Sequence, residues 1–197
     1  VNLAYNVIVF LPFISLMEKG ILKKAFFIIV LGIVVMSMKR GAIVVLPLMI
    51  VAMMFTEAKI KKESLSTFIK VISILILFLG SLFIVDNFIG GFLGERFTPE
   101  ELMSGSTRDI LYSEAIDNIL QRSSFDFLIG TGSGSSTSVL GSSVHNEWLE
   151  FFFSFGLIGV TFYFIFIVTI IKDYFYLLKQ RSSYASAYSM AVVYLIT

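Results

Sequence analysis

The chain has 197 residues, of which 57% are hydrophobic and 15% are charged, whereas a soluble domain is about 45–50% apolar and about 25% charged. This much apolar surface cannot be hidden in a water-soluble core, which excludes a soluble globular domain and indicates membrane-spanning helices. The net charge of +1 indicates no particular partner, and the absence of cysteine excludes disulfides and thiolate metal sites.

The apolar segments predict an all-α bundle of about six transmembrane helices, because about 20 apolar residues are needed to cross the hydrocarbon layer. Segment 21–58 is too long for one span and contains Lys39 and Arg40 near its midpoint. We therefore expect two helices that turn at Lys39–Gly41, with a kink at Pro47 in the second. The predicted spans are 3–17, the two halves of 21–58, 68–85, 149–171 and 184 onward.

The chain begins at Val1 without a methionine and stops at Thr197 inside an apolar run. We therefore expect residues 1–197 to be a single membrane domain within a longer protein.

The charged residues predict the orientation of the spans. Ten of the 15 basic residues lie in the loops 18–24, 57–70 and 172–181, so these loops are expected on the cytoplasmic side. Segment 86–150 holds three arginines but ten of the 14 acidic residues. Residues 86–148 are therefore predicted to form one large extracytoplasmic loop, and parity also puts the turn at Lys39 and Arg40 on the outer face.

This loop divides into three parts. Ser106 and Asp109 are typical of a helix start. An amphipathic helix is then expected to about Arg122, with its apolar positions at Ile110, Leu111, Ala115, Ile116, Ile119 and Leu120. The helix should lie on the membrane or against the bundle. Segment 130–143 is rich in Gly and Ser, and we interpret it as a flexible hinge rather than a phosphate loop.

Two arginines are candidates for anion binding. Arg40 lies at membrane depth, where an ionisable group is often functional, although a side chain that snorkels to the lipid headgroups is an equal alternative. Arg108 falls in the first turn of the loop helix, where a cation opposes the helix dipole. The same helix end has free N–H groups that can bind a phosphate. The alternative for Arg108 is a salt bridge to a nearby acid such as Asp109.

His145 is the single histidine of the chain and precedes the fifth predicted span. A neutral imidazole at a helix N-terminus can accept a proton near neutral pH, but a boundary histidine bonded among headgroups is the common alternative. Trp148 is typical of an interfacial anchor. Glu147 and Glu150 could orient His145 or face solvent. A single histidine with scattered acids has no metal-ligand spacing.

Four short motifs follow one another along the chain: Ser37-Met-Lys-Arg40-Gly-Ala, Ser106-Thr-Arg108, Ile129-Gly-Thr-Gly132 and His145-Asn-Glu-Trp-Leu-Glu150. A glycine also follows His145 after ten residues, at Gly156. These motifs and their order resemble the O-antigen ligase and polymerase superfamily over roughly residues 25–166, and the family shares the spacing between the histidine and the glycine.

The resemblance implies a membrane-embedded, metal-independent glycosyltransferase without a cofactor, in the bacterial cytoplasmic membrane with its site on the outer side. It implies transfer of a glycan from an undecaprenyl-pyrophosphate carrier to a second lipid-linked glycan (polymerase) or to lipid A core (ligase). Arg40 and Arg108 would bind the pyrophosphate, His145 would act as base, and Asn146 and Glu147 would bind substrate. The expected partners are these two glycans, membrane lipids and other polysaccharide-assembly proteins, and no nucleic acid.

The acidic loop favours the polymerase, because ligases of the family tend to have a basic outer loop for their acceptor. Two other classes are alternatives: a transporter or flippase, and a non-enzymatic scaffold of a polysaccharide-assembly complex. A transporter would need ionisable groups or broken helices in mid-span, whereas the charges here lie at the ends of the predicted spans.

Overall fold

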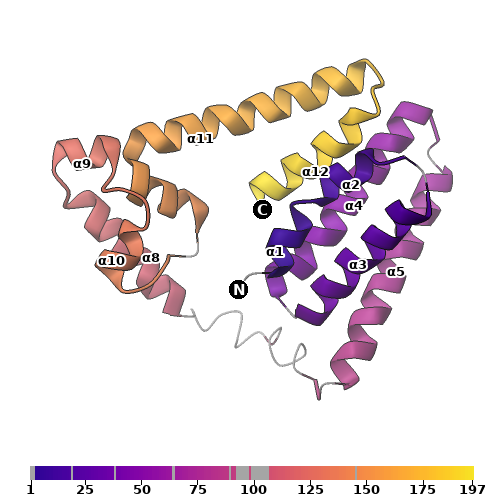
Figure 1. The fold of residues 1–197 in the computed structure, drawn as a ribbon, viewed down its shortest axis with the longest axis horizontal. Coiled ribbons are helices and arrows are strands. Elements are labelled where there is room, and N and C mark those ends of the chain that lie inside the picture. The colour runs from indigo at the N-terminus through magenta and orange to yellow at the C-terminus, as the bar shows by residue number, and fades with distance from the viewer. Residues whose placement is uncertain are drawn as a thin grey trace. The chain divides into compact units, whose positions relative to one another are not determined.

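The computed structural model is all-helical over the residues that it describes, which are 3–18, 20–37, 39–63, 65–88, 90–91, 98, 107–144 and 146–197. For Arg40, Arg108 and Glu147 the description covers the backbone. The helices are α1 (Leu3–Ile8), α2 (Leu11–Leu16), α3 (Ile21–Ser37), α4 (Arg40–Lys61), α5 (Leu65–Phe88), α8 (Thr107–Leu120), α9 (Ser124–Ile129), α10 (Ser135–Leu140), α11 (Glu147–Lys179) and α12 (Tyr184–Ile196) (Figure 1).

Three of the described helices contain a stretch long and apolar enough to cross a membrane: Gly41–Lys61, Ser66–Phe88 and Trp148–Lys179. The other predicted spans correspond to shorter helices: Leu3–Leu16 and Tyr184–Ile196 are apolar segments below spanning length, and α3 has 17 residues. The predicted all-helical membrane protein is therefore confirmed, and the structure supports three spans of full length.

The predicted turn at Lys39–Gly41 is confirmed, because α3 ends at Ser37 and α4 begins at Arg40. Lys39 is extended, with φ −82° and ψ 113°, which interrupts the helical backbone. The Ser37 hydroxyl donates to Val34 O at 2.8 Å and accepts from Lys39 N–H at 3.4 Å. The turn is thus held by a polar side chain that satisfies groups left free at the end of a helix.

The described chain divides into two compact units, and the first consists of Val1–Leu93 and Thr169–Thr197. Within it α12 lies against α4 and α2 (Figure 1). The centre of its core is fully buried and includes Leu46 and Met49 of α4, Val34 of α3 and Met190 of α12. Within a membrane, apolar contacts of this kind hold helices together by van der Waals packing, because the lipid tails are as apolar as the side chains.

The second unit is Gly94–Val168, and its described helices α8, α9 and α10 surround the first part of α11. A helix in the predicted place is confirmed as α8, which ends at Leu120; Ser106 lies outside the described residues. Ala115 and Ile119 are buried against Val144 and Phe153. The remaining predicted apolar positions are not all covered, since Ile110, Ile116 and Leu120 are exposed.

Because α11 contains a stretch of spanning length, the residues before and after it should lie on opposite sides of the membrane. Ser133 and Ser183 are both exposed, and the chain has no cysteine of its own. In cells, Ser133→Cys should react with an impermeant thiol reagent, and Ser183→Cys should react only after the membrane is permeabilised. Equal labelling of both variants in intact cells would contradict this topology.

Candidate active site

The predicted site residues fall in both units. Arg40 is the first residue of α4 in the first unit. Arg108 lies in the first turn of α8, and Asn146 and Glu147 lie at the start of α11, all in the second unit. His145 lies outside the described residues, directly between Val144 and Asn146, which are described. The second unit therefore contains every predicted site residue except Arg40.

Helical periodicity indicates which face of α8 carries Arg108. Residues three and four positions apart share one face of a helix, so Arg108 falls on the face of α8 that includes Tyr112, Ala115 and Ile119. This face packs against the cluster that contains Val144, the residue before His145. The first turn of α8 and the start of α11 are thus parts of one packed unit.

A break at Gly156 divides α11 into two helical segments, and the shorter first segment turns away from the long remainder (Figure 1). Gly156 has φ 62° and ψ −161°, a conformation essentially confined to glycine. Gly130 has nearly the same conformation, with φ 78° and ψ −176°. The two glycines also touch: a Cβ on Gly156 would lie 2.5 Å from Gly130 N, and a Cβ on Gly130 would overlap the backbone of Ser154 and Phe155.

The break leaves backbone carbonyls at the end of the first segment without intrahelical donors, and the Gly/Ser segment supplies them. Phe153 O accepts from Thr131 N–H and Thr131 Oγ1, both at 3.2 Å. Ser154 O accepts from Gly132 N–H at 2.9 Å. The segment around Gly130–Gly132 therefore caps the C-terminal end of the first helical segment of α11.

Arg122 completes this cap from the end of α8. Its Nη1 donates to Phe153 O at 2.8 Å, and its Cζ lies 3.9 Å from the centroid of the Phe153 ring, within cation–π range. Burial lowers the pKa of the Arg122 guanidinium and the nearby Asp126 carboxylate opposes that shift, but arginine remains charged at neutral pH. Within the described part of the chain, its Nη2 is buried without a hydrogen-bond partner.

Sequence reasoning missed this role of Arg122, because the partner carbonyl is 31 residues away and a backbone group leaves no signal in the side-chain pattern. The flexible hinge expected over 130–143 was also wrong. This segment contains α10, and Ser135 and Ser136 of α10 are buried. Its glycines serve particular backbone conformations rather than mobility.

Asn146, the residue directly before α11, caps this helix with its side chain. Asn146 Oδ1 accepts from Leu149 N–H at 3.1 Å, as is usual for the residue that precedes a helix. The Glu150 carboxylate, one turn on, accepts from Ser136 Oγ and from Ser143 Oγ, each at 2.6 Å, and from Val144 N–H at 2.7 Å. Glu150 therefore does not simply face solvent, which was one of its two sequence-based alternatives.

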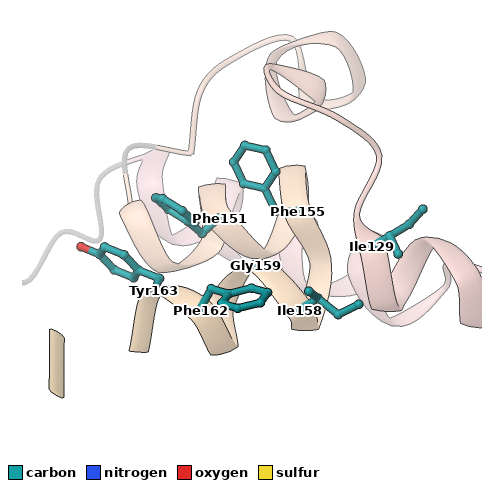
Figure 2. Close-up of a pocket in the computed structure, with 7 residues that line it drawn as sticks. All are labelled: Ile129, Phe151, Phe155, Ile158, Gly159, Phe162 and Tyr163. Atoms are coloured by element: carbon teal, nitrogen blue, oxygen red, sulfur yellow. The ribbon is translucent and has the colours of Figure 1, made fainter. Parts of the chain in front are cut away.

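An apolar groove lies beside the break, with a volume of about 440 Å³. Figure 2 shows the rings of Phe151, Phe155, Phe162 and Tyr163 around Gly159, with Ile129 and Ile158 at one side. The rings of Phe151 and Tyr163 stack with centroids 4.5 Å apart. Gly159 leaves the space open, because a Cβ there would meet the side chain of Phe155. Among the described residues, no group of three or more acidic or histidine side chains could hold a metal ion.

Comparison with known proteins shows the family to which the chain belongs. A family model described as O-antigen ligase matches residues 25–164, which extend from α3 into α11 and include Arg40, Arg108, His145 and Gly156. No curated protein and no solved structure matches the chain.

Gly130→Ala and Gly156→Ala should each lower the melting temperature of the detergent-solubilised protein. A side chain in this backbone conformation costs about 1–3 kcal/mol, and the Cβ would also overlap the facing backbone. Gly80→Ala in α5 is the matched control, since its Cβ meets open space in a helix and should leave the melting temperature unchanged or slightly raised. Melting temperatures of Gly130→Ala and Gly156→Ala equal to that of the control would show that the glycine contact is dispensable.

Proposed function

We propose that this chain carries the active site of a polysaccharide polymerase. The chain belongs to the O-antigen ligase family, whose members are membrane enzymes that transfer glycans. The enzyme would transfer a glycan from an undecaprenyl-pyrophosphate carrier to a sugar hydroxyl of a second lipid-linked glycan. The reaction would take place on the outer face of the cytoplasmic membrane, with 86–148 as an extracytoplasmic loop in a bundle of about six spans. The observation that carries the proposal is the family match across Arg40, Arg108 and His145.

The proposed reaction is a substitution at the anomeric carbon of the donor sugar. His145 accepts the proton of the acceptor hydroxyl as the oxygen attacks the anomeric carbon. The bond from that carbon to the pyrophosphate oxygen breaks, and undecaprenyl pyrophosphate leaves with the bonding electrons. A glycosidic bond forms, and the proton remains on the imidazole until solvent removes it. Asn146 and Glu147 would bind the sugars beside His145.

Arg40 and Arg108 are proposed to bind the leaving pyrophosphate. Arg40 begins α4, and Arg108 lies in the first turn of α8. A cation in the first turn of a helix is unfavourable by itself, but an anion there is stabilised by the free N–H groups and by a bidentate guanidinium. The position of both arginines in first turns thus supports an anionic ligand, and such groups would stabilise the charge that develops in the transition state.

The aromatic groove supports a lipid-linked donor. The residues of α11 that line the groove all lie in the stretch of spanning length, Trp148–Lys179. The surface of the groove is almost wholly apolar. An isoprenoid tail suits such a surface, because it has no polar groups and can be bound by van der Waals contacts alone. The groove adjoins the segment of α11 that follows His145, so a tail there would leave the pyrophosphate near the start of α11.

The purified protein, reconstituted in liposomes with a lipid-linked oligosaccharide, should produce longer glycans that remain attached to the carrier lipid. His145→Gln should reduce the rate by about two to four orders of magnitude, because the amide cannot accept the proton, while binding of the donor is retained. The wild-type rate should fall at acidic pH as the imidazole is protonated. Transfer to lipid A core alone would indicate a ligase, and a wild-type rate in His145→Gln would remove the proposed base.

A photo-crosslinking residue in the groove should react with the carrier lipid. Phe162 lines the groove, whereas Phe164 is similarly exposed on the opposite face of α11. With benzoylphenylalanine at position 162, the donor lipid should be captured, and unlabelled carrier should compete for the site. Position 164 is the matched control for random contact with lipid. Equal capture at both positions, without competition, would show that the groove is only part of the lipid-facing surface.

A further inference from the structure

The Glu150 carboxylate connects three separate parts of the second unit. Its Oε2 accepts from Ser136 Oγ of α10, and its Oε1 accepts from Ser143 Oγ and Val144 N–H in the loop before α11. All three distances are 2.6–2.7 Å, which is typical of charge-assisted hydrogen bonds. Glu150 also lies in the first turn of α11, where the helix dipole favours a negative charge.

The described residues on both sides of His145 are held by hydrogen bonds to the first turn of α11. Val144 precedes His145: its N–H is bound by Glu150, and its side chain is fully buried in the cluster with Ala115 and Phe153. Asn146 follows His145: its Oδ1 accepts from Leu149 N–H at 3.1 Å, and its carbonyl accepts from Glu150 N–H at 2.8 Å. The backbone before and after His145 is therefore tied to the same turn of α11.

Two of the partners of the Glu150 carboxylate are hydroxyl groups, those of Ser136 in α10 and of Ser143 in the loop before α11. The core of the unit is held by apolar contacts of Ala115, Ile119, Val144 and Phe153, which do not require a charged group at position 150. What the carboxylate adds is the position of the backbone next to His145.

We infer that Glu150 is a positioning residue for His145: it holds the Val144–Asn146 turn so that the imidazole reaches the acceptor hydroxyl. This inference rests on the proposed function, in which His145 is the base. Glu150 contacts no substrate in this assignment. A displacement of about 1 Å at a catalytic group can lower a rate about 100-fold, so the loss of the two carboxylate bonds to Ser143 and Val144 should be visible in the rate.

Glu150→Gln, which is the conservative variant, should have a higher kcat than Glu150→Ala, which removes the carboxylate. In Glu150→Gln the amide oxygen can take the place of Oε1 and keep the bonds to Ser143 and Val144, while the Ser136 hydroxyl can accept from the amide nitrogen. Glu150→Ala loses all three bonds. In the reconstituted transfer assay, Glu150→Ala should lower kcat about 10- to 100-fold with little change in the KM of the donor, and Glu150→Gln should recover most of the rate. Glu114→Ala, which removes an exposed carboxylate of α8, is the matched control and should be active.

A double-mutant cycle separates positioning from general stability. If Glu150 acts through His145, Glu150→Ala should cause no further loss in a His145→Ala background, because the group that it positions is absent. Additive losses would overturn the inference, and so would a wild-type kcat in Glu150→Ala. Should Glu150→Ala not be recovered from membranes, Ser143→Ala removes one bond beside Val144 and must still lower kcat, with its loss also absent in the His145→Ala background. An inactive wild-type enzyme would instead refute the proposed function itself.

Discussion

The structure of the second unit depends on the contact between two glycine backbones, Gly130 and Gly156. Each has a conformation that is accessible to glycine alone, and neither has room for a Cβ. Because the two backbone segments approach this closely, the carbonyls of Phe153 and Ser154 come within hydrogen-bonding distance of Thr131, Gly132 and Arg122. The helix can break at this point because its free carbonyls are satisfied by that neighbouring segment.

The break also reconciles a long helix with a membrane of limited thickness. The 33 residues of α11 would extend about 50 Å as one straight helix, well beyond the roughly 30 Å of hydrocarbon. Residues 157–179 alone reach about 34 Å, which is sufficient for a span. The first segment, which includes Glu150, is thereby available to pack with α8 and α10 and to hold Val144, the residue before His145.

The sequence predicted where the helices lie more accurately than which of their residues are buried in contacts. Apolar length and the charges of Lys39 and Arg40 predicted the helix turn there, since both signals are local. The periodicity of α8 predicted a helix, but it could not distinguish Ala115 and Ile119, which are buried, from Ile116 and Leu120, which are exposed. That distinction depends on where α11 lies. The Gly/Ser composition of 130–143 suggested mobility, because composition does not reveal that a glycine is required for close packing.

The candidate site was predicted from motifs, and the structure supplies a physical reason for two of them. Gly156, which is separated from His145 by ten residues, marks the break in α11, and Gly130–Gly132 marks the cap of that break. The roles of Arg122 and Glu150 could not be predicted, because their partners are a distant carbonyl and a backbone N–H. Arg40 belongs to the first unit, and its proposed role depends on the family motif and on its position at the start of α4.

The most direct test of the account is a cryo-EM structure of the protein with a bound lipid-linked donor. In that structure the pyrophosphate should contact the guanidinium groups of Arg40 and Arg108. The His145 imidazole should face the side of the anomeric carbon opposite the pyrophosphate. A donor bound with its pyrophosphate away from both helix starts, or a His145 that faces away from the sugar, would contradict it.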